Sequence, residues 1–361
     1  MRLPDVPVIG HGGRRARIQL RQLAVVTVLV CAVTPIFNVL TSAPTLRSAI
    51  QGVVDGVLVC ALVGGYLQFV RDGLLRPWIR RMSFAADLAI SSPTVVALFL
   101  LGRGIGQVLT TLDPSRLWRS LLEPHLHFYA LPYFLVLSLA VLFGLQMNRM
   151  IGANVLRYFV GGRYHRPIAE ERIFLFLDVE GSTALAERLG SGRYFELLRR
   201  FVDDLTDPIV ASGGEIYQYA GDEVVVTWRL ADGVRDANCV RCFFWSREAM
   251  AHERARYTRD FGTAPRFRGG LHGGLVTAGE LGDLRRQIVF VGDILNTAAR
   301  LEEYAKRTGL DLVVSGSLLE RLALPPGVEA RRCGELALRG KEAPVSAYNL
   351  SAAPHPAPRS G

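Results

Sequence analysis

The chain has 361 residues, 50% of them hydrophobic, and carries a formal net charge of +9. This length favours two domains, and a mean hydropathy of +0.23 is high for a soluble enzyme. The five cysteines are odd in number and widely scattered, which argues against a disulfide framework. Many basic residues flank apolar segments, so the positive charge favours a membrane surface over a nucleic-acid partner.

Four apolar runs occupy the N-terminal part of the chain, at about 22–41, 50–70, 85–109 and 128–147. Each is close to the roughly 20 residues that a helix needs to cross a bilayer. Four such runs in succession argue against buried core helices of a soluble domain. The length of the first run, and the runs that follow it, argue against a cleaved signal peptide. We therefore expect an all-α, four-helix transmembrane domain over residues 22–147, embedded in a lipid bilayer.

The arginines predict the orientation of this domain. They gather in the N-terminal segment 1–21, in the loop after the second run and in the segment after the fourth, whereas the other two loops hold few. The positive-inside rule then predicts a multi-pass protein of the inner or plasma membrane, with both termini and everything after the fourth run in the cytoplasm.

Charged residues within the runs bear on the function of the transmembrane domain. The second run contains Asp55, and the third contains Asp87 and Arg103. Such groups pair between helices, mark a ligand site or lie near a helix end, and the sequence leaves these alternatives open. So few charges give little support to a transporter. The remaining roles are an anchor, a dimerisation domain, or a sensor of a lipid, a quinone or a small ligand.

A connector is predicted over 148–171, a second domain over 172–350 and a disordered tail over 351–361. Gly161, Gly162 and Pro167 interrupt any helix that continues from the fourth run into the connector.

Cys239 and Cys242 form a CxxC in the second domain. They lie within a helical pattern and have no second pair of candidate ligands. We interpret them as packing residues one turn apart, because a zinc or redox site requires more ligands or a different setting.

The first motif of the second domain is RIFLFLDVEGSTALAERLG. Its apolar run 173–177 predicts a buried strand that ends at Asp178. Gly181, Ser182 and Thr183 then open an amphipathic helix. A carboxylate at a strand end, followed by the free backbone amides of a helix N-terminus, suits a site for a metal ion and phosphates.

Two more motifs follow. In GGEIYQYAGDEVVVTW, residues 215–219 and 223–228 predict two strands around a tight turn, with Asp222 at the tip of the hairpin. In FVGDILNTAARLEEYA, a short strand leads into a helix that carries Asn296 and Arg300. These two residues are four apart and therefore share one face of the helix.

Together these segments resemble the class III adenylate/guanylate cyclase catalytic domain. FLDVEGST is similar to the first metal motif of the family, YAGDEVVV to the second, and GDILNTAAR to the helix that carries the transition-state residues. LHGGLVTAGELG resembles the glycine-rich strand pair between them, and CGELALRGKEAPVSAYNL the last strands. The resemblance covers about residues 170–350 in the family's order. It implies an α+β, ferredoxin-like or palm-like fold around a central, mostly antiparallel sheet.

The resemblance also implies a reaction, in which the ribose 3′-hydroxyl of a nucleoside triphosphate attacks the α-phosphate and pyrophosphate leaves. Asp178, Asp222 and the backbone carbonyl of Val179 match the ligands of two Mg²⁺ or Mn²⁺ ions. Asn296 matches the residue that positions the ribose, and Arg300 the residue that stabilises charge on the phosphoryl group. The positions expected to contact the nucleotide are Gly181, Ser182, Thr183, Gln218, Val289, Asp293 and Lys341. In the family the metal ligands come from one subunit, and the Asn and Arg from the other, so a homodimer is implied.

The chain departs from the family where the base is read. The first base-reading position, usually Lys in adenylate cyclases and Glu in guanylate cyclases, is Gln218 here, and the second, typically Asp or Thr, is Val289. A glutamine amide both donates and accepts, so it suits either base. If the alignment is shifted locally, Arg286 or Gln287 takes this role. We favour ATP because most family members of bacterial type make cyclic AMP.

Three alternatives remain beside the membrane-bound adenylate cyclase that we predict. The first is a guanylate cyclase with the same mechanism. The second is a catalytically silent nucleotide-binding sensor, which the altered base-reading positions keep open. The third is a diguanylate cyclase, because YAGDEVVV also resembles the GGDEF segment. The helix GDILNTAAR has no counterpart in those enzymes, which argues against the third.

Overall fold

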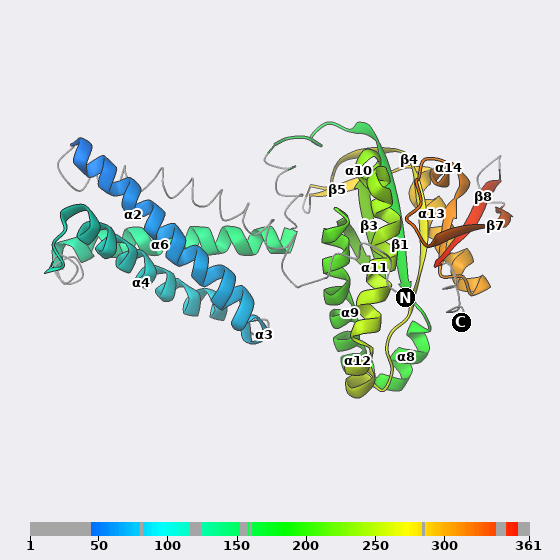
Figure 1. The fold of residues 1–361 in the computed structure, drawn as a ribbon, viewed down its shortest axis with the longest axis horizontal. Coiled ribbons are helices and arrows are strands. Elements are labelled where there is room, and N and C mark those ends of the chain that lie inside the picture. Colours follow the sequence, from blue (N-terminus) through cyan, green and yellow to red (C-terminus); the bar gives the residue numbers. More distant parts are fainter. Residues whose placement is uncertain are drawn as a thin grey trace, which may run out of the picture. The chain divides into compact units, whose positions relative to one another are not determined.

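The computed structural model describes residues 45–79, 82–115, 124–151, 158, 161–283, 286–336 and 344–352. The chain divides into two compact units, one over Ala16–Leu156 and one that contains Arg157–Gly361 (Figure 1). The predicted first run, 22–41, and Lys341 lie outside the described residues.

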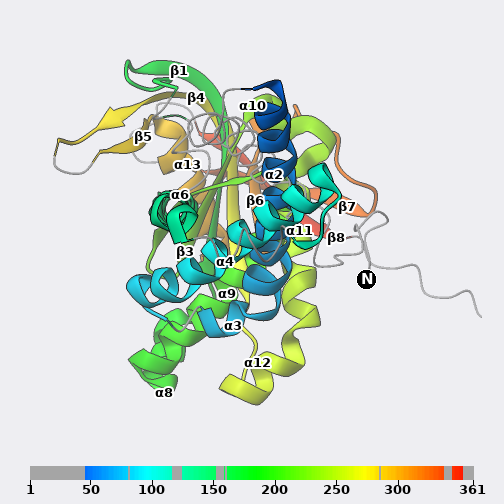
Figure 2. The same ribbon diagram turned by 90° about the vertical axis from the view of Figure 1, so that its left-hand side faces the viewer.

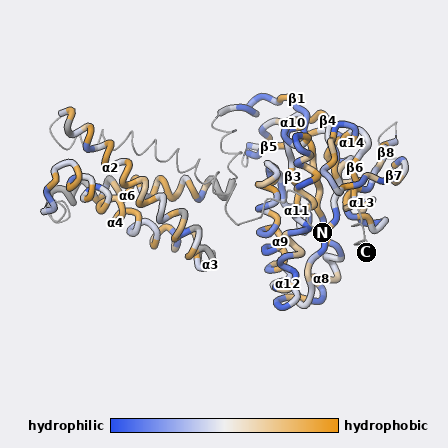
Figure 3. The backbone as a smooth tube through the Cα atoms, in the orientation of Figure 1, coloured by the Kyte–Doolittle hydropathy of each residue, from blue (hydrophilic) through white to orange (hydrophobic). Residues whose placement is uncertain are grey.

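The first unit is helical. Helix α2 (Leu46–Gly65) continues into the π-helical segment η1 (Tyr66–Leu74) and the short α3 (Arg76–Ile79), and α4 (Phe84–Thr111) and α6 (Pro124–Ile151) follow. Side-chain caps begin two of these helices, because Thr45 accepts a hydrogen bond from the Ser48 amide and Ser83 from the Ala86 amide. Hydrophobic residues line α2, α4 and α6 along their length (Figure 3).

Two helical segments among the described residues are long and apolar enough to cross a membrane, Ser48–Arg71 and Phe84–Thr111. Phe134–Met147, within α6, is a shorter apolar helix. This criterion uses length and composition alone, and a core helix of a soluble protein or a signal sequence also meets it. The four-helix transmembrane domain therefore stays a prediction.

A buried polar cluster ties three helical segments together around Asp87, in the first turn of α4. The Asp87 carboxylate pairs with Arg71 of η1 at 2.5 Å, and accepts hydrogen bonds from Gln146 of α6 and, at 2.9 Å, from Ser91. Two of the three alternatives that the sequence leaves open hold for Asp87, which pairs between helices and lies near a helix end. Asp55 is also buried, and packs against Gly106 of α4.

The second unit is built on an eight-stranded sheet in the order β2-β3-β1-β4-β6-β8-β7, with β5 paired to β4. The strands are β1 (Ile168–Val179), β2 (Glu215–Ala220), β3 (Glu223–Arg229), β4 (Phe267–Leu281), β5 (Gln287–Val291), β6 (Leu312–Ser315), β7 (Val328–Leu336) and β8 (Val345–Ala352). All pairs are antiparallel except β4 with β6. The expected mostly antiparallel sheet and the hairpin around Asp222 are confirmed.

The helices of this unit are α8 (Ser182–Leu189), α9 (Ser191–Ala211), α10 (Leu230–Val234), η2 (Arg235–Ala237), α11 (Asn238–His252), α12 (Arg254–Phe261), α13 (Asp293–Thr308) and α14 (Gly316–Leu319). Successive side chains of a strand point to opposite faces of the sheet, and β1 follows this rule. Its Leu175 and Leu177 join the core shared with α9 and α11, whereas Phe174 and Phe176 join the core shared with α13. The helices therefore cover both faces of the sheet (Figures 1 and 2).

Cys239 and Cys242 are fully buried on α11 in the first of these cores. Burial raises the pKa of both thiols, which makes them unreactive. Their interpretation as packing residues is confirmed.

Two strands extend beyond the expected bounds. Strand β1 begins at Ile168 rather than 173, because residues 168–172 also pair with β4. These five residues alternate in exposure, so they form no apolar run that would predict a strand. Strand β8 runs to Ala352, two residues into the segment expected to be a disordered tail.

Candidate active site

Strand pairing brings the two predicted metal ligands together. Asp178, near the end of β1, lies opposite Glu223, the first residue of β3, and Asp222 directly precedes it in the turn. Gly221 makes this turn possible with a φ of 67°, a conformation that glycine adopts without strain. One oxygen of Asp222, Oδ2, is buried and has no hydrogen-bond partner among the described residues.

Further acidic groups surround this pair. Burial raises the pKa of Glu223 to about 7, and the charges of Asp178 and Asp222 add to the effect. Glu302 of α13 has its pKa raised to about 7 by burial and by Asp178. The pKa of Asp178 itself is raised by burial and by Asp222, against the opposing effect of Lys306. The site therefore concentrates negative charge that a cation would stabilise.

Lys306 supplies positive charge from the last turn of α13, with its Nζ 2.5 Å from Asp178 Oδ2. Motif reasoning missed Glu302 and Lys306, because they lie beyond the GDILNTAAR segment.

The N-terminus of α8 follows Asp178 closely. Gly181 caps this helix with a φ of 66°, and Ser182 and Thr183 begin it. The first amides of a helix have no partner within the helix, so they are available to phosphate oxygens. Burial, followed by the charge of Asp222, raises the pKa of Tyr194 of α9, a residue that the motifs did not indicate.

Asn296 and Arg300 lie on the same helix as Lys306, nearer to its beginning. Asn296 is exposed and Arg300 half-buried. At 1.5 Å per residue, they lie about 15 Å and about 9 Å along the helix axis from Lys306, which contacts Asp178. Among the described residues, neither of them forms a hydrogen bond or an ion pair with Asp178 or Asp222.

The predicted base-reading positions flank a contact between β2 and β5. Tyr217 and Phe290 have ring centroids 5.1 Å apart, and the Phe290 amide donates a hydrogen bond to the Tyr217 hydroxyl at 3.5 Å. Gln218 and Val289 are their chain neighbours, the first exposed and the second half-buried. Asp293 is exposed at the start of α13.

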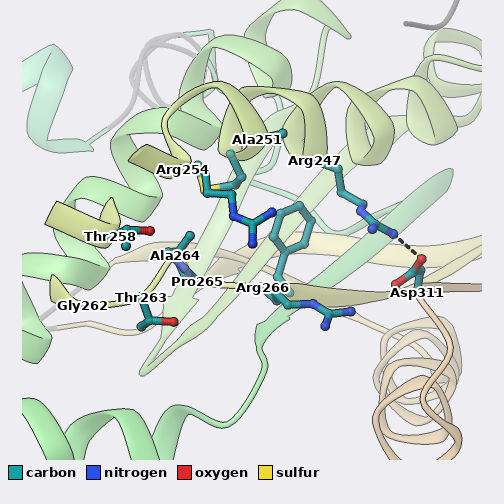
Figure 4. A pocket seen from close by; sticks show the side chains of 12 residues that line it. Arg247, Ala251, Arg254, Thr258, Gly262, Thr263, Ala264, Pro265, Arg266 and Asp311 are labelled. Carbon is teal, nitrogen blue, oxygen red and sulfur yellow. Dashed lines mark ion pairs between the residues drawn. The ribbon is translucent and has the colours of Figure 1, made fainter. Parts of the chain in front are cut away.

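A cavity of about 560 Å³ lies on the other face of the sheet (Figure 4). Phe267 lines it, pairs with Val179 in the sheet, and packs in the core of α9 and α11. Asp178 is adjacent to Val179 in the strand and so points to the opposite face. Of the arginines around the cavity, Arg247 is paired with Asp311. This cavity is separate from the aspartate pair.

Comparison with known proteins identifies the domain. The model of the family "Adenylate and Guanylate cyclase catalytic domain" matches residues 168–352. The chain is 38% identical over 222 residues to Adenylate cyclase 2 of Rhizobium meliloti (strain 1021), covering 62% of this chain and 61% of that protein. It is 26% identical over 184 residues to an adenylate cyclase of Anabaena cylindrica, covering 49% of this chain and 36% of that protein.

The fold has a counterpart among solved structures. A bacterial light-regulated adenylyl cyclase superposes with a TM-score of 0.53 at 20% identity, covering 63% of this chain and 66% of that one. The chain spans less than two thirds of the length of each relative named here. The family model matches more than half of the chain, in the region where β1, the β2–β3 hairpin and α13 form the site. The chain therefore belongs to the family of class III adenylate and guanylate cyclases, through a catalytic domain at residues 168–352.

Proposed function

We propose that the protein is a membrane-bound adenylate cyclase that converts ATP into 3′,5′-cyclic AMP and pyrophosphate. The observation that carries this proposal is the placement of Asp178 beside Asp222, just before the N-terminus of α8. The choice of ATP is supported by the relatives, two of which are named adenylate cyclases.

The aspartate pair fits Mg²⁺ or Mn²⁺. Both ions prefer oxygen ligands, and Asp222 Oδ2 is a buried carboxylate oxygen without a hydrogen-bond partner among the described residues. The part of the chain that the structure describes includes no group of three or more His, Cys, Asp or Glu side chains arranged to hold a metal. The backbone carbonyl of Val179 and the substrate phosphates would complete the ligand set. When bound, two such ions lower the pKa of the 3′-hydroxyl and neutralise phosphate charge.

The residues of the chain itself orient the substrate. The free amides at Ser182 and Thr183 would hold phosphate oxygens at the positive end of α8. Asn296 would fix the ribose, and Arg300 would stabilise the charge that develops on the α-phosphate. Because neither Asn296 nor Arg300 forms a hydrogen bond or an ion pair with the aspartates of its own chain among the described residues, we propose that a second copy supplies them. The active form is then a homodimer with two equivalent sites.

Gln218 and Val289 are proposed to face the base, and the contact between Tyr217 and Phe290 holds their two strands together. Neither residue selects adenine decisively, so GTP is the second candidate substrate.

We also propose that the helical unit anchors the protein as a multi-pass domain of the inner or plasma membrane. The two apolar segments Ser48–Arg71 and Phe84–Thr111 support this anchor. Reporter fusions after each predicted span would test it, with cytoplasmic signals expected at both termini. A protein that alkaline carbonate releases from membranes would refute it.

The central experiment is product analysis by mass spectrometry. Full-length protein is offered ATP and GTP in parallel, with Mg²⁺, Mn²⁺ or a chelator. Wild type should form cyclic AMP only with a divalent ion, and Asp222→Ala should form none. Asp232→Ala removes a half-exposed carboxylate of α10 that pairs with Arg235, and it should behave as wild type. Cyclic GMP alone would keep the mechanism and change the substrate. A folded dimer that forms neither product would favour the silent sensor.

A further inference from the structure

Lys306 makes a contact that the proposed reaction does not use. Its ammonium lies 2.5 Å from a carboxylate oxygen of Asp178, one of the proposed metal ligands. The Asp178 side chain is 11% exposed, whereas that of Lys306 is 50% exposed. The position of Lys306 in the last turn of α13 also suits a cation, because carbonyl dipoles make that end of a helix negative.

Lys306 lies beside a cluster of four carboxyl groups. Asp178, Asp222, Glu223 and Glu302 influence one another electrostatically. Among the described residues, no Lys or Arg except Lys306 forms an ion pair with any of these four carboxylates.

The neighbouring cations are directed elsewhere. Arg268 pairs with Glu180 and donates to the carbonyl oxygens of Ala305 and Leu310. Arg307, the next residue on α13, lies over the ring of Tyr304. The charge of Lys306 is therefore the local compensation for the acidic site.

We propose that Lys306 is an internal counter-ion that competes with the divalent cation for Asp178. The proposal rests on the proposed metal site. A carboxylate oxygen held by an ammonium group has fewer lone pairs free for a metal ion, so metal binding must displace the ammonium. The lysine has a flexible, half-exposed stem, and so it can move into solvent at little cost. The contact stabilises the site when the metal concentration is low and raises the concentration at which the metal binds.

The test uses full-length protein in detergent without nucleotide. Calorimetry measures the Kd for Mn²⁺, and thermal unfolding in a chelator measures stability without metal. Lys306→Met should bind Mn²⁺ about fivefold to tenfold more tightly, the effect of an ion-pair contact of about 1 kcal/mol. In the chelator it should unfold about 2–4 °C below wild type, and saturating Mn²⁺ should remove this difference. Lys306→Gln repeats the test with a polar side chain.

Arg307→Met is the matched control, because it removes one positive charge from the same turn without touching Asp178. Its Kd for Mn²⁺ should stay within about twofold of wild type. If both variants bound Mn²⁺ more tightly than wild type by the same factor, the cause would be a general charge effect, and the proposal would be overturned. Weaker binding by Lys306→Met would also overturn it, since Lys306 would then support the metal. Failure of the proposed function would look different, because neither wild type nor any variant would bind Mn²⁺.

Discussion

Arg172 shows how a single residue holds the start of the catalytic domain together. It is fully buried on β1, where its Nε donates to Glu170 at 2.6 Å and its guanidinium lies 4.6 Å from the ring centre of Phe290. Tyr164 also donates to Glu170, at 2.9 Å. Burial alone would raise the pKa of Glu170, but the hydrogen bonds and the charge of Arg172 outweigh it and hold this pKa below 4.5.

Replacing Arg172 should cost stability in a pH-dependent way. Arg172→Met removes the fully buried partner of Glu170 and leaves this carboxylate with Tyr164 and the half-exposed Arg163. It should lower the free energy of unfolding by about 1.5–3 kcal/mol at pH 7. A lowered pKa stabilises the folded state above the ordinary value of 4.5, and this contribution is lost as the pH falls through the lowered value. The difference in free energy of unfolding between variant and wild type should therefore narrow as the pH falls below 4.5. Denaturant titrations that follow tryptophan fluorescence can measure it, because Trp228 and Trp245 are buried in this domain.

Arg321→Met is the control for this prediction, since Arg321 pairs with Glu171 on the surface. Its cost should be about 1 kcal/mol or less. If Arg172→Met lost as much free energy of unfolding, relative to wild type, at acidic pH as at pH 7, the role given to Glu170 would be contradicted.

Base selection is the second prediction at this scale. Gln218 is exposed, so its replacement should change specificity with little effect on folding. Gln218→Lys should raise the ratio of cyclic AMP to cyclic GMP about tenfold, which corresponds to 1.4 kcal/mol, and Gln218→Glu should lower it. Gln287→Lys places the same charge on β5. If the ratio of cyclic AMP to cyclic GMP changed more in Gln287→Lys than in Gln218→Lys, the base-reading residue would be Gln287.

Motif reasoning located the residues of the site unevenly. Asp178 and Asp222 follow from a strand end and a tight turn, which are local signals, and the sheet register brings them together. Glu302, Lys306 and Tyr194 depend on how helices pack over that register. Such packing joins residues far apart in sequence, and no local pattern reports it.

The contact between β4 and α13 has no room for a side chain at one point. A Cβ on Gly270 would lie 2.2 Å from the backbone nitrogen of Glu302 and 2.3 Å from the carbonyl oxygen of Ala298. Backbone atoms cannot rotate away as side chains do, so the helix would have to shift as a whole. That helix carries Asn296, Arg300 and Lys306.

Gly270→Ala should therefore impair both stability and catalysis. The expected loss is about 1–3 kcal/mol in the free energy of unfolding, with a fall in cyclase rate larger than the loss of folded protein explains. Gly192→Ala is the control, because a Cβ at Gly192 of α9 meets nothing within 4 Å. A Gly270→Ala variant as active and stable as Gly192→Ala would show that α13 adjusts freely.

Element prediction succeeded where periodicity and turns coincide. The β2–β3 hairpin appears close to its expected bounds, and β5 leads into α13 in the expected order. The beginning of β1 was missed, because its first five residues include polar side chains and form no apolar run. They nevertheless pair with β4. In the helical unit, α4 and α6 contain their predicted runs and extend beyond them.

At the scale of the whole molecule, the proposal that the aspartates and Arg300 of one site come from different chains has a genetic test. Asp222→Ala and Arg300→Ala should each be inactive alone. Coexpressed, the two chains form mixed dimers with one intact site, so random pairing should restore about a quarter of wild-type activity. Cyclic AMP measured in membranes from such cells checks this. If the coexpressed chains were as inactive as either variant alone, each site would take its aspartates and its Arg300 from the same chain.

The central position of β1 also affects how the domain is made. Its partners on β4 lie roughly 90–110 residues further along the chain, as in the pairs of Val179 with Phe267 and Ile168 with Ala278. At a synthesis rate of about 5–20 residues per second, the ribosome needs roughly 5–20 s to produce them. During that time the apolar strand has one open edge in the nascent chain. Fast elongation or chaperone capture at this stage should therefore affect the yield of folded enzyme, because late strand pairings limit folding rate.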